Sequence, residues 1–191
     1  MSVFPVSAAE NKSLAIELAD FLHRKIENTD SQDVWSTRNF ELLREFSKTN
    51  CADCFPDPGT GERQFLWDFI AYVPEHGILI AAESEFDRKR KEIEHDFEKL
   101  LYVRCPIKLM MCRMRTEAEA EEIRSWLEDV AKSTCKEYSP AEVFVVYCVW
   151  WSESSGGNRD FAYYLQIKGE PMHRAIGTER FDRVHFDRGA M

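Results

Sequence analysis

Acidic side chains concentrate in two neighbouring, largely apolar segments of the sequence. Asp68 lies in the segment that follows Gln64, and Glu83 and Glu85 close the apolar run that begins at Gly77. Carboxylates placed close together repel one another and raise their own pKa values unless a cation lies between them. Oxygen ligands of this kind suit Mg²⁺ or Mn²⁺. The residue types therefore predict a site for one of these ions.

Two paired strands could bring these acids to one place. Side chains alternate between the two faces of a strand, which predicts one face made of Leu79, Ala81, Glu83 and Glu85. The opposite face is then expected to hold Ile78, Ile80, Ala82 and Ser84. Residues 74–77, Pro-Glu-His-Gly, have the chemistry of a tight reversal. A hairpin around this turn would bring Asp68 close to Glu83.

The order of these elements resembles the core of a known enzyme superfamily. A strand with Asp68, a turn, a strand ending in Glu83-Ser84-Glu85, a helix and another strand follow one another between about Glu41 and Met114. This order resembles the PD-(D/E)XK phosphodiesterases, which have the restriction-endonuclease-like fold. The resemblance implies an α/β fold, in which helices flank a mixed central β-sheet with an αβββαβ core. It places Asp68 and Glu83 at the two acidic motif positions.

Glu85 stands where the superfamily usually has its lysine, which orients or activates the attacking water. Some members carry the basic group on the next helix instead, and Lys99 follows there in a suitable place. Asp96 is its neighbour on the helix surface, so a surface ion pair is the alternative role for Lys99. In the superfamily a glutamate from the helix ahead of the strands often joins the metal site. Glu45 is the candidate here, and a solvated helix charge is its alternative role.

Length and charge limit the classes of function. The chain has 191 residues and a formal net charge of −9, which predicts one domain without a broad basic nucleic-acid surface. Residues 1–35 are expected to form an N-terminal helical extension, and the structure of the tail, 169–191, is left unassigned. A nucleic acid would have to be held by a local patch, for which the basic run Arg88 to Lys91 is the candidate. The sequence lacks a signal peptide and a membrane-spanning run, so we expect a cytoplasmic protein.

The remaining patterns predict the elements around the acids. Capping boxes at Ser7 and Thr116 predict helix starts, and Ser36 or Thr37 is the expected cap of a second helix. Residues 50–63 are rich in proline and glycine and predict a loop. A charged helix is expected over 87–104, and buried strands are expected over 107–114, 143–151 and 161–167, the first of them parallel to its neighbour.

Two cysteines have the spacing of zinc ligands. Cys51 and Cys54 are separated by two residues, but a zinc site needs a second pair of cysteines or histidines, and none is evident. A loop with two thiols is therefore the main interpretation, with zinc as the alternative. The other four cysteines lie in or beside apolar segments and are expected to be small core residues.

Three hypotheses for function follow. The first is a nuclease that uses Mg²⁺ or Mn²⁺, with Asp68 and Glu83 as ligands, Glu85 as a further ligand and Lys99 orienting water. The second is a nuclease-like module that has lost catalysis and binds or regulates a partner protein, which Glu85 and the acidic net charge favour. In the third, the acids are separately solvated or paired with arginines. The substrate, DNA or RNA, and the oligomeric state stay open.

Overall fold

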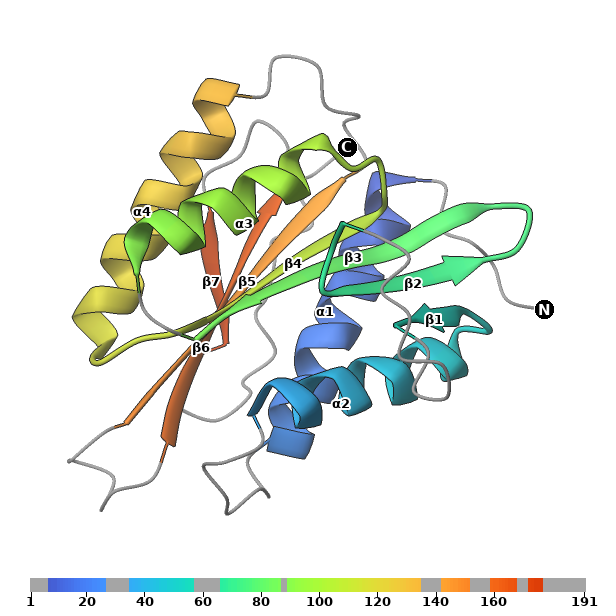
Figure 1. The fold of residues 1–191 in the computed structure, drawn as a ribbon, viewed down its shortest axis with the longest axis horizontal. Helices are drawn as coiled ribbons and strands as arrows, with labels where there is room; N and C mark the ends of the chain where they lie inside the picture. The colour runs from blue at the N-terminus through green and yellow to red at the C-terminus, as the bar shows by residue number, and fades with distance from the viewer. Residues whose placement is uncertain are drawn as a thin grey trace, which may run out of the picture.

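The computed structural model describes residues 7–26, 35–56, 66–86, 89–134, 142–151, 159–167 and 172–176. It is an α/β structure whose helices lie on both faces of a seven-stranded mixed sheet (Figure 1). The elements in chain order are α1 (Ala8–Ile26), α2 (Trp35–Thr49), β1 (Asp53–Phe55), β2 (Phe69–Val73), β3 (Gly77–Glu85), α3 (Arg90–Tyr102), β4 (Ile107–Arg113), α4 (Glu117–Thr134), β5 (Val143–Trp151), β6 (Arg159–Ile167) and β7 (His173–Ile176).

The strands lie in the sheet in the same order as in the chain. β1, β2 and β3 form an antiparallel meander, and β5, β6 and β7 form another. Between them, β3 pairs with β4 and β4 with β5 in parallel, because α3 and α4 return the chain to the starting edge of the next strand. The predicted parallel strand over 107–114 is thereby confirmed.

Two apolar clusters, one on each face, hold the helices to the sheet. The α1/α2-side cluster includes Leu18, Leu43 and Met111, and the α3/α4-side cluster includes Phe97 and Met110. Adjacent residues of β4 therefore point into different clusters, as strand geometry requires. The central strands are buried on both faces, which explains their nearly unbroken apolar sequences.

The helix caps are predicted correctly at two of three places. Ser7 and Glu10 form the reciprocal capping box of α1: the Ser7 N–H donates to Glu10 Oε2 at 2.9 Å, and the Glu10 N–H donates to Ser7 Oγ at 3.2 Å. The Glu119 N–H donates to Thr116 Oγ1 at 3.2 Å at the start of α4. The expected cap at Ser36 or Thr37 is wrong, because α2 already begins at Trp35.

Two short edge strands differ from the sequence expectation. β1 lies inside the predicted loop 50–63 and pairs with β2, with Cys54 opposite Ala71. β7 lies in the tail that received no assignment and pairs with β6. Both are only three or four residues long, so their sequences hold too little alternation to reveal a strand. The rest of the loop, 57–63, and most of the tail fall outside the described residues.

β2 is shorter than expected and is paired with a bulge. It begins at Phe69, so Asp68 directly precedes the strand. The register with β3 shifts: Ala71 lies opposite Ile80, but Tyr72 lies opposite Ile78. Leu79 is the extra residue, and it packs in the α1/α2-side cluster while Ile78 packs against the other one. The faces predicted for these two residues are therefore wrong, because a bulge reverses the alternation.

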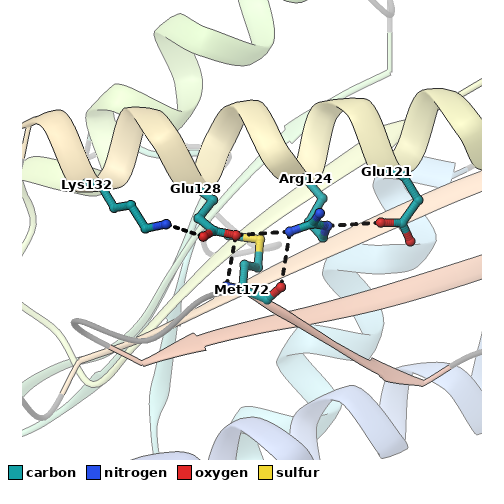
Figure 2. Close-up of polar contacts among 5 residues, drawn as sticks. All are labelled: Glu121, Arg124, Glu128, Lys132 and Met172. Atoms are coloured by element: carbon teal, nitrogen blue, oxygen red, sulfur yellow. Dashed lines mark hydrogen bonds and ion pairs between the residues drawn. The ribbon is translucent and has the colours of Figure 1, made fainter.

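Side chains of α4 anchor the residue that leads into β7. Figure 2 shows Arg124 and Glu128 holding both backbone groups of Met172. Glu128 Oε2 accepts the Met172 N–H at 3.0 Å, and Arg124 Nη1 donates to the Met172 carbonyl at 3.2 Å. Burial alone would raise the pKa of Glu128, but the Lys132 ammonium and the Met172 N–H hold it below its usual value. We call Arg124, Glu128 and Met172 the α4 clamp.

Candidate functional site

The β2–β3 hairpin brings Asp68 and Glu83 together. Phe69 lies opposite Ala82, so the next pair outward in an antiparallel ladder is Asp68 and Glu83. Ala81 packs in the α3/α4-side cluster, and alternation places Glu83 on this same face. The negative charge of Asp68 contributes to raising the pKa of Glu83, as expected of two neighbouring carboxylates.

Asp68 is held by hydrogen bonds from β3. Its Oδ2 accepts the Ser84 N–H at 3.0 Å and the Ser84 hydroxyl at 3.1 Å. These two bonds fix the carboxylate at the end of the hairpin. They engage Oδ2, and no bond to Oδ1 comes from the residues that the structure describes.

Glu83 is fully buried, and Lys99 is its charged partner among the described residues. Its Oε1 lies 2.9 Å from Lys99 Nζ, whereas its Oε2 has no hydrogen-bond partner among the described residues. Burial raises the pKa of Glu83 to about 8, and the charge of Asp68 acts in the same direction against the opposing effect of Lys99. Burying a carboxylate with an unpartnered oxygen lowers the stability of a protein. Such a group therefore indicates a functional site more than a packing role.

Lys99 reaches the site from α3 and lies between two carboxylates. Its Nζ is 2.9 Å from Asp96 Oδ1 as well as from Glu83 Oε1, and its side chain is 19% exposed. Burial alone would lower the pKa of Lys99, but the hydrogen bonds to Asp96 and Glu83 outweigh it and raise the pKa. Asp96 is the first of the two partners that keep the ammonium charged. The contact between Lys99 and Glu83 is not a surface ion pair, because Glu83 is fully buried.

Glu85 stands two residues after Glu83 and beside β4. Its register partner is Cys112. Burial is the main cause that raises the pKa of the Cys112 thiol, and the charges of Glu85 and Asp96 add to it. Glu85 and Asp96 therefore both act on the α3 side of the sheet.

Glu45 is placed away from this site. It lies on α2, whose buried residues pack in the cluster on the opposite face of the sheet. Its Oε1 is 2.8 Å from Lys25 Nζ of α1, and both side chains are nearly half exposed. The structure therefore supports the solvated helix charge, and it does not bring Glu45 to Asp68 and Glu83.

The basic run at the start of α3 is partly neutralised. Arg90 lies 3.4 Å from a Glu122 carboxylate oxygen, with its guanidinium 4.6 Å from the centre of the Trp126 ring. Lys89 and Lys91 are exposed, and Arg88 falls outside the described residues. The local patch expected to grip phosphate is thus weaker than the sequence indicates.

Two sets of side chains, the carboxylates Asp68 and Glu83 and the thiols Cys51 and Cys54, are the candidate metal ligands. In the part of the chain that the structure describes, no group of three or more His, Cys, Asp or Glu side chains is arranged to hold a metal. Cys51 is exposed, and burial raises the pKa of the Cys54 thiol, which disfavours the thiolate that zinc requires. Mg²⁺, in contrast, is commonly bound by one or two carboxylates and completes its shell with water and substrate phosphate. Asp68 and Glu83 are the two carboxylates that could hold such an ion.

A second buried ion pair was not anticipated from the sequence. Lys108 of β4 is fully buried, and its Nζ lies 2.9 Å from Glu142 Oε2 and 5.0 Å from the centre of the Phe144 ring. A lysine inside a strand that is covered on both faces must have an acidic partner close by. Lys108 carries that signal within the apolar run Ile107 to Met114. Cys105, Cys112 and Cys148 are buried and form no disulfide, as expected of core residues, and Cys135 falls outside the described residues.

None of the helices in the described ranges is both long and apolar enough to span a bilayer. No protein-family model matches the sequence, and no curated protein or solved structure is significantly similar to it.

Proposed function

We propose that the protein is a phosphodiesterase that hydrolyses nucleic acid with Mg²⁺ or Mn²⁺ bound at Asp68 and Glu83. The observation that carries the proposal is the fully buried carboxylate of Glu83, which has one oxygen on Lys99 and the other unpartnered. A lysine, two carboxylates and a dry environment are the components that metal-assisted hydrolysis needs.

The order of the elements supports the same proposal. α2, the strands β1 to β3, α3 and β4 follow one another as helix, three strands, helix and strand. This is the αβββαβ order that the resemblance to PD-(D/E)XK phosphodiesterases implies. Glu85 stands at the position that usually holds the lysine of the motif. Lys99 of α3 provides a cation next to Glu83 instead.

Each side chain has a role that follows from its contacts. A divalent ion, when bound, lowers the pKa of water and stabilises charge on phosphoryl oxygens. Asp68 offers Oδ1 and Glu83 offers Oε2 as ligands, and Ser84 holds Asp68 in place through two hydrogen bonds. Lys99 neutralises the charge that develops on Glu83 and orients the attacking water. Glu85, two residues after Glu83 on β3, would add a further oxygen ligand.

Nuclease assays with isosteric variants test the proposal. Labelled single- and double-stranded DNA and RNA are incubated with Mg²⁺ or Mn²⁺, with a chelator in parallel. Asp68→Asn and Glu83→Gln are expected to abolish cleavage, and Asp129→Asn, an exposed site on α4, is the matched control. Cleavage that persists in both site variants or in the chelator refutes the proposal.

A catalytically inactive binding or regulatory module is the second candidate. Two observations favour it: Lys99 already lies 2.9 Å from Glu83 Oε1 without a metal, and Glu85 replaces the usual lysine. Calorimetric titration with Mg²⁺ and Mn²⁺ separates the two candidates. Binding that Glu83→Gln removes supports the phosphodiesterase, whereas absence of both binding and cleavage supports the inactive module.

A further inference from the structure

We propose that Asp96 is a positioning residue, which holds the Lys99 ammonium against Glu83. This inference rests on the proposed function, because it assigns Asp96 a role at the same site. Asp96 is not one of the expected site residues, and its spacing from Lys99 would otherwise indicate only a surface pair.

The contacts of Lys99 form a short chain across the site. Its Nζ is 2.9 Å from Asp96 Oδ1 on one side and 2.9 Å from Glu83 Oε1 on the other. Asp96 and Lys99 are three residues apart on α3 and are both less than one fifth exposed. Water therefore competes weakly for these bonds, and the carboxylate of Asp96 retains the ammonium beside Glu83.

The backbone beneath Lys99 is held as well. The Trp67 indole N–H donates to the Lys99 carbonyl at 3.2 Å, and Trp67 directly precedes Asp68. Phe97 and Leu100, on either side of Lys99, are buried in the α3/α4-side cluster and set the rotation of the helix. The first acid of the site and the helix turn that carries the lysine are thus tied together.

A fixed backbone does not by itself place the ammonium. The lysine side chain has four rotatable bonds, so its charged end can reach solvent from the same backbone position. Glu83 Oε1 supplies one contact to the ammonium, which has three donors and so needs a second partner to be fixed in place. Asp96 is the remaining described partner of Lys99 Nζ. Loss of Asp96 should therefore release the ammonium from Glu83 without disturbing the hairpin that carries the acids.

Direct observation of the lysine ammonium by NMR tests this role without any substrate. The ¹H–¹⁵N signals of NH₃⁺ groups are visible when exchange with water is slow, and the Lys99 signal is assigned by its absence in Lys99→Met. We expect it to weaken or disappear in Asp96→Asn and to persist in Asp96→Glu, which keeps the charge. Asp129→Asn is the control for the loss of one aspartate on a neighbouring helix. An unchanged Lys99 signal in Asp96→Asn overturns the inference.

Kinetics provides the second measurement. If the protein cleaves nucleic acid, kcat of Asp96→Asn should fall at least about tenfold, since misplacing a reacting group by about 1 Å can cost about 100-fold. KM should stay within about twofold, because the lysine acts on the chemical step, and Asp96→Glu should recover part of kcat. An unchanged kcat contradicts the inference. If no substrate is cleaved, the proposed function fails, but the NMR result still decides whether Asp96 positions Lys99. Thermal unfolding of each variant excludes a folding defect as the cause.

Discussion

The pKa of Glu83 leads to a defined pH dependence of stability in the metal-free protein. Its ordinary value is 4.5, and burial raises it to about 8 in the folded chain. Between these values the folded state binds a proton that the unfolded state has lost. The stabilising effect of this proton is fully present below pH 4.5 and disappears as the pH rises through about 8.

The size of the effect follows from the two pKa values. Each pH unit in this window changes the free energy of unfolding by about 1.4 kcal/mol for one proton. Over the whole window the loss for Glu83 is up to about 5 kcal/mol. Glu83→Gln cannot titrate, so it should resemble the wild type near pH 4.5 and be the more stable protein at pH 9.

Urea unfolding followed by circular dichroism measures this difference. Three proteins are unfolded in chelator: the wild type, Glu83→Gln and the control Glu94→Gln, which changes a partly exposed position on α3. The pH runs from 5 to about 9, the range over which protonation of Glu83 should change the free energy of unfolding. Subtracting the free energy of unfolding of Glu83→Gln from that of the wild type cancels the contributions that the two proteins share. If the two free-energy curves run parallel across this range, Glu83 is not held protonated and the reasoning is refuted.

Three further predictions concern the packing. Lys108→Met should lower the free energy of unfolding by about 3–5 kcal/mol, because it leaves Glu142 buried without its cation. Adding Glu142→Gln should restore part of the loss, and a Lys108→Met protein as stable as the wild type in urea contradicts the prediction. Glu128→Gln should weaken the α4 clamp by about 1–3 kcal/mol and speed hydrogen exchange at the Met172 amide, while unchanged exchange there would show that the clamp does not hold β7. Phe97→Ala should cost about 3–5 kcal/mol because it empties a fully buried position, and a loss below about 1 kcal/mol in the same unfolding assay would contradict the observed packing.

The reach of sequence reasoning is clearest in the central strands and the helix caps. β3, β4 and β5 carry long apolar runs, and the capping boxes at Ser7 and Thr116 place a hydroxyl and a carboxylate three residues apart. These signals are local, since a few consecutive residues suffice to define them. The α/β class and the β2–β3 hairpin could be predicted for that reason.

The acidic site is a mixed case. The sequence determined that Asp68 and Glu83 belong to the two arms of one hairpin, because the turn at 74–77 and strand alternation are both local properties. It also drew attention to Lys99 as a replacement for the usual lysine. It could not determine that Glu83 is fully buried, nor that Lys99 lies between Glu83 and Asp96.

Only the tertiary structure decided those contacts and the features that depend on distant partners. β1 and β7 are strands because a neighbouring strand offers hydrogen bonds, and the bulge at Leu79 depends on the register with β2. Lys108 can be buried because Glu142, far along the chain, lies beside it. Local sequence patterns predict the helices and strands. Burial and ion pairing depend on residues that are remote in sequence, so only the tertiary structure determines which charged side chains lie in contact.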